Sequence, residues 1–249
     1  PSSRLQAKEG QCHALQSMAN VHAECGRSEQ AIELFEEALE IARTRGNEVV
    51  TASILMNLGG TLLDAGCMER AEQVLRAAKL THEDHGRKVF QALSTYNLAW
   101  LFWLRGDLLV TREYLEEAHA LCVTTGAKRF GAMFLLSLSA CDADQNNLEA
   151  ARTKFGTAKQ MLMPTDDQVI HSLCDLAEAH QDLADFRASS DPTQRKALIK
   201  AVRERMEKAH VRSPRTKEYP DGQPSPADSS VSIRAALRLL DINLTALAC

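Results

Sequence analysis

The chain has 249 residues, of which 45% are hydrophobic, 25% are charged and only 5% are aromatic, and its formal net charge is −4. This composition is typical of a globular protein and excludes intrinsic disorder, a collagen-like chain and a disulfide scaffold. The acidic balance leaves no excess of Lys and Arg to neutralise phosphates, so we expect no nucleic-acid partner. The few aromatics and the many Ala, Leu, Glu, Gln and Arg residues favour helices over strands, which predicts an all-α protein.

The sequence also indicates where the protein resides. No apolar run approaches the roughly 18 residues that span a bilayer, and the N-terminal residues lack the apolar region of a signal peptide. The seven cysteines form no Cys-x-x-Cys pair, which favours reduced thiols. We therefore expect a cytoplasmic protein with no membrane partner. Because the sequence lacks an initiator Met, we also expect a segment of a larger protein, in which any catalytic domain lies outside this chain.

Internal repetition with a period of forty residues is the main feature of the sequence. The turn-forming residues that recur at this interval are Gly26, Gly66, Gly106 and Asn146 in one series and Gly46, Gly86 and Gly126 in a second. Gly and Asn tolerate the left-handed backbone of a tight turn or a helix cap. A fixed period of this length is typical of a solenoid, in which similar units stack along one direction.

Each repeat is predicted to form two antiparallel helices. The first has about 14 residues and ends before the first glycine, and the second is longer and ends at the second glycine. Small residues in the first helices allow close approach, and they are Ala19, Gly59, Ala99 and Ser139. Large residues in the second helices fill the remaining space, and they are Phe35, Leu75, Leu115 and Phe155. One hairpin cannot bury its own apolar face, so the hairpins are expected to stack into a superhelix.

This pattern resembles the tetratricopeptide repeat, whose signature is a Leu-Gly pair, a large residue three positions later, and Ala and an aromatic in the second helix. Leu58-Gly59 matches the pair, and Ala31 with Phe35 matches the second helix. The standard repeat has about 34 residues, so we expect the additional residues at the end of the second helix and in the connection after it. Longer repeats of this kind are similar to those of spindle-orientation adaptors, Rap-type regulators and large bacterial signalling kinases and ATPase regulators. The resemblance implies a right-handed superhelical solenoid of antiparallel helical hairpins.

The predicted units follow in chain order. They are an N-terminal extension of the first helix at 1–10, four repeats at 11–46, 47–86, 87–126 and 127–166, and a degenerate fifth repeat at 167–210. In the fifth repeat we expect a turn stretched over residues 184–191, followed by a helix with Asp191 as its N-cap and Pro192 at its first position.

The last part of the chain is predicted to contain a proline-rich connector at 211–229 and an amphipathic helix at 230–249. Residues 230–247 of this helix dock in one of three ways. They cap the end of the stack, they occupy the groove as a built-in ligand, or they pack on another domain or a second copy of the chain.

Motifs for catalysis are missing from the sequence. It has no phosphate-binding Gly-rich loop, no His-Glu-x-x-His and no Gly-x-Ser-x-Gly. His82 and His85 have a spacing that zinc ligands adopt on one helical turn, but we interpret them as a solvated helix end. The cysteines are interpreted as core thiols. We therefore expect no enzyme activity in this segment, no metal and no cofactor.

The resemblance also implies a concave groove lined by the first helix of each repeat. The groove positions that we predict to bind a partner are Asn20, Met56, Asn57, Tyr96, Asn97, Trp100, Trp103, Met133, Leu136 and Ser137. Asn57 and Asn97 precede the Leu of the signature pair, as in spindle adaptors and kinesin light chains, where Asn binds the main chain of a peptide. The other interpretation is local capping between repeats. Tyr96, Trp100 and Trp103 share one helix face and are either core residues or anchors for a ligand.

These features predict a non-catalytic scaffold for protein–protein interaction, which binds a peptide or helical segment of a protein partner in its concave groove. The alternative is a sensory or regulatory segment of a larger bacterial signalling kinase or transcription regulator. In that case the groove binds a small ligand or a segment of the same chain.

Overall fold

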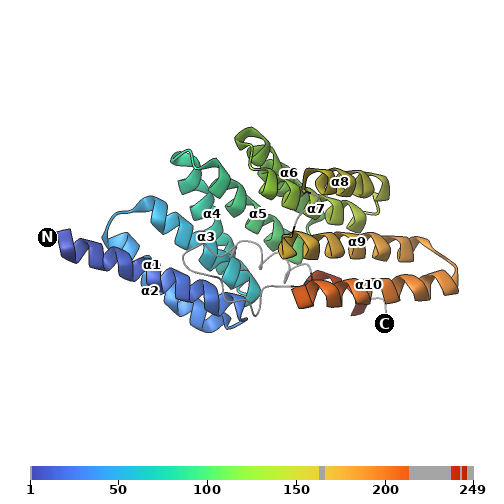
Figure 1. The fold of residues 1–249 in the computed structure, drawn as a ribbon, viewed down its shortest axis with the longest axis horizontal. Coiled ribbons are helices and arrows are strands. Elements are labelled where there is room, and N and C mark those ends of the chain that lie inside the picture. The colour runs from blue at the N-terminus through green and yellow to red at the C-terminus, as the bar shows by residue number, and fades with distance from the viewer. Residues whose placement is uncertain (1, 163–165, 213–236, 242, 246–249) are drawn as a thin grey trace.

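The computed structural model describes residues 2–162, 166–212, 237–241 and 243–245, and all of its regular structure in these ranges is helical (Figure 1). The helices are α1 (Ser2–Glu24), α2 (Ser28–Thr44), α3 (Glu48–Asp64), α4 (Met68–Asp84), α5 (Lys88–Leu104), α6 (Leu108–Thr125), α7 (Lys128–Asp144), α8 (Leu148–Leu162), α9 (Gln168–Ala188) and α10 (Pro192–Arg212). Residues 237–241 and 243–245 are helical as well. Consecutive helices pack against one another, so the predicted all-α solenoid of helical hairpins is confirmed.

The two helices of a repeat have nearly the same length. In the second repeat α3 and α4 have 17 residues each, and in the third α5 has 17 and α6 has 18. Our expectation of a short first helix and a long second helix is therefore wrong. Both turns of a repeat stop the helix in the same way, so the residues beyond the standard repeat length extend both helices.

Residues in the left-handed conformation close the turns. At Gly66 φ is +78°, its N–H donates to Leu63 O at 3.0 Å, and the N–H of Cys67 donates to Leu62 O at 2.9 Å. These two bonds satisfy carbonyls that the end of a helix would leave unpaired. The same backbone conformation occurs at Gly26, Gly46, Gly86, Gly106, Gly126 and Asn146. Both series of turn residues predicted from the sequence are confirmed.

Close contact between the two helices of a hairpin depends on the small residues. A Cβ atom on Gly59 would lie 2.5 Å from Cγ and Cδ2 of Leu75, which is closer than such atoms can approach. Ala19, Ala99 and Ser139 at the equivalent positions are fully buried. The repeated small residue therefore sets the distance between the helices of each pair.

Two departures from the repeat pattern are compensated by polar contacts. Thr111 replaces an Ala, and its hydroxyl donates to Asp107 O at 2.7 Å. Asp142 replaces a large apolar residue and is fully buried, where it pairs with Arg112 of α6 and Lys154 of α8. A buried carboxylate needs such partners to offset its lost hydration. The buried charge in α7 therefore links three consecutive helices.

The last described helical pair differs from the others. α9 and α10 have 21 residues each, and residues 184–188 continue α9 because Ala184 and Phe186 pack in the interior. The predicted stretched turn over 184–191 is therefore wrong. Asp191 Oδ1 accepts from the N–H of Thr193 at 2.9 Å before a helix that begins at Pro192, which confirms the predicted N-cap. Apart from its partner α10, α9 packs against α7 more than against α8.

The described part of the C-terminal helix packs on the same chain. Leu239 and Leu240 are buried, and Asn243 Oδ1 accepts a hydrogen bond from Arg187 of α9 at 3.1 Å. Most of the predicted connector and the beginning of the predicted C-terminal helix, residues 213–236, lie outside the described residues. Residues 211 and 212 of the predicted connector belong to α10.

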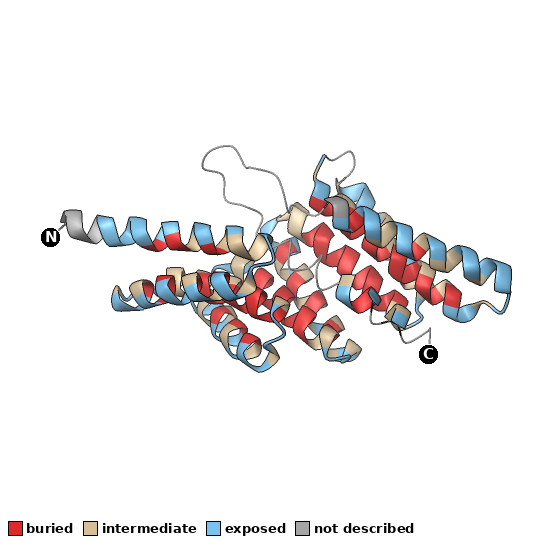
Figure 2. Cartoon of the chain, turned by 90° about the horizontal axis from the view of Figure 1, so that it is seen from below, coloured by how far each residue is buried: buried red, intermediate tan, exposed pale blue. Residues whose placement is uncertain are grey.

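Burial is greatest in the middle of the molecule. Buried residues cover nearly all sides of α5, α7 and α9, whereas α1 and α10 are exposed along most of their length (Figure 2). Among the described helices, none is long and apolar enough to cross a membrane.

Candidate partner-binding surface

The predicted groove positions differ in exposure along the stack. Asn20 of α1 and Asn57 of α3 are half-buried and reach the surface. The remaining predicted positions are buried, and they are Met56, Tyr96, Asn97, Trp100, Trp103, Met133, Leu136 and Ser137. The face that we predicted to bind a partner is therefore open at α1 and α3 and closed at α5 and α7.

The open part consists of polar side chains from two helices. We call it the inner surface and define it by six half-buried residues, which are Gln16, Asn20, Glu24, Ser53, Asn57 and Asp64. Asn57 Nδ2 donates to Asn20 Oδ1 at 3.5 Å, so the two carboxamides join α3 to α1. A carboxamide has two N–H donors and two acceptor lone pairs, and this bond uses one group on each side. The pair therefore keeps donors and acceptors that a bound main chain can use.

The aromatic residues of α5 form a cluster with a phenylalanine of α7. The rings of Trp100 and Trp103 stack with centroids 4.8 Å apart, and Tyr96 meets Trp100 edge-on at 6.0 Å. Tyr96 also packs on Phe134 at 4.5 Å. Such pairs contribute about 0.5–1.5 kcal/mol each beyond the burial of their surface. The three predicted anchors lie in the core, as in our alternative interpretation.

Polar partners from α7 and α9 cover this cluster. The Tyr96 hydroxyl is 2.8 Å from Ser137 Oγ, and the Trp103 indole N–H donates to Asp144 Oδ2 at 3.0 Å. His180 of α9 lies over Trp103, with ring centroids 5.5 Å apart, and its Nδ1 is 2.8 Å from Asp144 Oδ1. Sequence reasoning missed the role of His180. The sequence signal that could have indicated it is a histidine in line with Leu173, Ala177 and Ala184 on one apolar helix face.

The buried cysteines do not have the properties of nucleophiles. Burial raises the pKa of Cys122 and of Cys174 to about 11 and that of Cys141 to about 12. The thiolate, and not the thiol, is the nucleophilic form. These three side chains therefore remain protonated at neutral pH and act as packing residues.

The histidine pair on α4 and its C-terminal turn does not form a solvated helix end. His82 is fully buried against Phe90, with ring centroids 5.4 Å apart, and burial together with Arg87 and His85 lowers its pKa to about 4. Our interpretation is therefore wrong for His82, because Phe90 at the start of α5 covers the end of α4. His85 is exposed and faces Glu48 at 3.3 Å. The described part of the chain contains no group of three or more His, Cys, Asp or Glu residues that could hold a metal ion.

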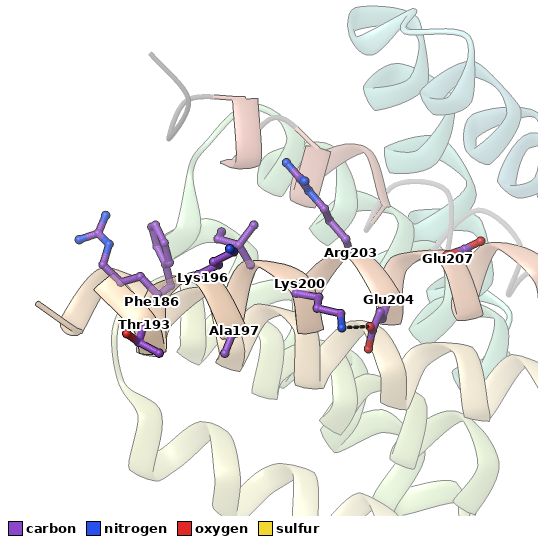
Figure 3. A pocket seen from close by; sticks show the side chains of 10 residues that line it. Phe186, Thr193, Lys196, Ala197, Lys200, Arg203, Glu204 and Glu207 are labelled. Carbon is purple, nitrogen blue, oxygen red and sulfur yellow. Dashed lines mark ion pairs between the residues drawn. The ribbon is translucent and has the colours of Figure 1, made fainter. Parts of the chain in front are cut away.

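A cavity of about 830 Å³ lies along α10 and the end of α9, and none of its lining residues belongs to the inner surface (Figure 3). Its lining contains Phe186 and several charged residues of α10. The guanidinium of Arg195 lies over the Phe186 ring at 4.1 Å, and Lys200 pairs with Glu204 at 3.7 Å. The charges of this lining are thus partly paired among themselves, as on the exposed face of a helix.

Comparison with known families agrees with the repeat geometry. Residues 10–79 match the family model of the tetratricopeptide repeat, and the helical hairpins continue with the same spacing through α8. Residues 10–79 thus match this repeat, and the series of helical hairpins in the described residues is consistent with a tetratricopeptide-repeat domain. Such repeats are non-catalytic scaffolds that generally mediate protein–protein interactions. A search of curated proteins finds no match to the chain.

Proposed function

We propose that the chain binds an extended or helical segment of a partner protein across the inner surface formed by α1 and α3, and that it performs no catalysis itself. The observation that carries this proposal is the change in exposure along the predicted groove. Asn20 and Asn57 reach the surface, whereas Asn97 and the Tyr96–Trp103 cluster are buried. The proposed site therefore occupies the N-terminal half of the solenoid.

The chemistry of the inner surface favours a peptide main chain as the ligand. The Asn20–Asn57 pair offers N–H donors and carbonyl acceptors side by side, and Ser53 lies one helical turn from Asn57. An extended peptide presents the same two kinds of group along its backbone, so amide side chains can bind it independently of its sequence. Side-chain specificity then comes from the residues around the pair.

Partner capture from a cell lysate tests this function. The double variant Asn20→Ala/Asn57→Ala is compared with the parent chain and with Gln30→Ala/Gln160→Ala, whose side chains are exposed on α2 and α8. We expect the first variant to lose a partner that the other two proteins retain, with unchanged helicity in all three. Equal recovery of every partner by the Asn variant would rule out this site.

The C-terminal helix supports a second candidate function, in which the chain regulates itself. The burial of Leu240 and the bond between Arg187 and Asn243 show that this helix occupies a surface of its own chain. Removing residues 230–249 separates regulation from simple packing. A partner bound only after the deletion supports autoinhibition, and aggregation without new binding indicates a structural cover.

A further inference from the structure

The helix α9 departs from the position that the repeat assigns to it. Apart from their hairpin partners, α3, α5 and α7 each pack mainly against the preceding second helix, which is α2, α4 or α6. α9 instead packs against α7 more than against α8 (Figure 1). His180 of α9 reaches across to α5, where the centroid of its ring is 5.5 Å from that of Trp103. α9 therefore covers part of the face of α5 that we predicted to bind a partner.

The contact between α9 and this face leaves two buried polar atoms unpaired. His180 and Trp100 are buried, and neither His180 Nε2 nor the Trp100 indole N–H has a hydrogen-bond partner among the described residues. A buried polar group without a partner destabilises the arrangement that buries it, because water would otherwise satisfy the group. Movement of α9 away from α5 would let water reach both atoms. Opening would thus remove an unfavourable feature of the closed arrangement.

The C-terminal helix contacts α9 on the same chain. By this helix we mean the described residues 237–241 and 243–245. Leu240 is fully buried, and Arg187 near the end of α9 donates through Nη2 to Asn243 Oδ1 at 3.1 Å. The leucines at 237 and 244 lie on the same side of the helix as Leu240 and pack against the core as well. The helix is therefore held by an apolar side and by one polar contact to α9.

Arg187 also connects the C-terminal helix to the aromatic cluster of α5. Its Nη1 lies 4.0 Å from Oδ1 of Asp144. The same carboxylate accepts from the Trp103 indole N–H and lies within hydrogen-bond distance of His180 Nδ1. One guanidinium thus joins the docked helix to the polar network that holds α9 over Trp103.

We propose that the C-terminal helix is a latch that holds α9 over the aromatic cluster, and that its release uncovers Tyr96, Trp100 and Trp103. The proposal rests on the second candidate function, self-regulation, and names the surface that is regulated. The docked helix favours the covered cluster and the released helix favours the uncovered one, so the latch biases one equilibrium between two arrangements. The closed half of the predicted groove is then available only after release.

Quenching of tryptophan fluorescence by acrylamide measures this uncovering, because both tryptophans of the chain belong to the cluster. The parent chain is compared with a variant that lacks residues 230–249 and with Leu240→Glu, in which a charge replaces the buried leucine. We expect stronger quenching in both variants than in the parent chain. The matched control is Asp241→Ala, which should leave quenching unchanged because Asp241 is exposed on the same helix.

Hydrogen exchange separates a latch from a general loss of stability. In the deletion variant, amide protection in α9 should fall on the order of tenfold or more, as expected for local opening after the loss of such contacts. Protection in α3 and α4, in the other half of the stack, should stay unchanged. A synthetic peptide of residues 230–249 added to the deletion variant should restore protection in α9, whereas the same peptide with Leu240→Glu should not.

The parent chain provides a test that needs no variant. If α9 opens only after the latch is released, amides of residues 237–241 should exchange at least as fast as those in the centre of α9, residues 173–181. Slower exchange in the C-terminal helix than in the centre of α9 would reverse this order and overturn the proposal.

Two results for the variants would also overturn it. One is equal tryptophan quenching in the parent chain and both variants. The other is an equal loss of protection in α3, α4 and α9, since the C-terminal helix would then stabilise the whole fold. Partner capture by the deletion variant is a separate measurement. If quenching rises but no new partner is captured, the latch is retained and regulation of partner binding is refuted, and the reverse result refutes the latch alone.

Discussion

The Trp103 indole N–H donates to Oδ2 of Asp144 at 3.0 Å, and Oδ1 of the same carboxylate is 2.8 Å from His180 Nδ1. One carboxylate thus connects α5, α7 and α9. It lies where the repeat pattern changes, because α9 packs on α7 instead of continuing the stack on α8.

Removing this carboxylate should loosen the closed half of the predicted groove. We expect Asp144→Ala to lower the free energy of unfolding by about 1–3 kcal/mol, since the buried Trp103 and His180 groups both lose a partner. Urea unfolding followed by Trp fluorescence measures the change. Asp84→Ala, on an exposed helix end, is the control. Equal losses in the two variants would contradict the structural role of Asp144.

Burial of His82 should make stability depend on pH. The unfolded chain protonates this residue near pH 6.5, whereas the folded chain does so only near pH 4. Between these values the unfolded state binds more protons, so stability falls as the pH is lowered through this window and is unaffected by His82 above it. The slope should be about 1.4 kcal/mol per pH unit within the window.

The variant His82→Leu should remove this part of the pH dependence. Neither ring nitrogen of His82 has a hydrogen-bond partner among the described residues, so Leu breaks no bond. Thermal unfolding at pH 7.5 and pH 5 should show a smaller drop in Tm for His82→Leu than for the parent chain. The exposed His85 serves as the control through His85→Leu. An unchanged drop in His82→Leu would show that His82 does not titrate as described.

Two helical glycines should respond in opposite ways to the same substitution. A methyl group at Gly59 collides with Leu75, whereas at Gly156 it meets no atom within 4 Å. We expect Gly59→Ala to destabilise the fold by about 1–3 kcal/mol through overpacking. Gly156→Ala should stabilise it by up to about 1 kcal/mol through helix propensity. Chemical denaturation of both variants measures the difference, and the same sign for both would refute the close contact.

Leu240 should anchor the C-terminal helix. Its side chain is fully buried in the hydrophobic core, with 0% of its surface accessible to water. Leu240→Ala is expected to cost about 2–5 kcal/mol or to release the helix. Hydrogen exchange across residues 237–245 distinguishes these outcomes, and the exposed Arg238→Ala is the control. Unchanged exchange and stability would mean that the packing of this helix does not depend on Leu240.

The repeat architecture could be predicted from the sequence because one residue type at one position determines each turn. Gly66 and its equivalents adopt a backbone that other residues avoid, and Asn146 can replace Gly there. The small residue at Gly59 likewise follows from a local requirement for close packing. Such features depend on neighbouring segments and recur with the period.

The exposure of the groove residues could not be predicted in the same way. Trp103 and Tyr96 stand at positions that the repeat alone leaves on a binding face, but α7 and α9 supply the partners Ser137, Asp144 and His180. The packing of α9 on α7 breaks the repeat, so the period contains no information about it. Asn57 of α3 is half-exposed, and no such break in the packing occurs near α3.

The even spacing of the helices limits how the chain can change in length. Successive helices from Ser28 to Gln168 begin twenty residues apart. Excision of residues 48–87 would therefore join Asn47 to Lys88 through the usual connection and yield a shorter solenoid with every face in place. Removal of only one helix would place each later first helix in the position of a second helix, and each later second helix in the position of a first helix. Insertions and deletions are thus tolerated only in whole hairpins.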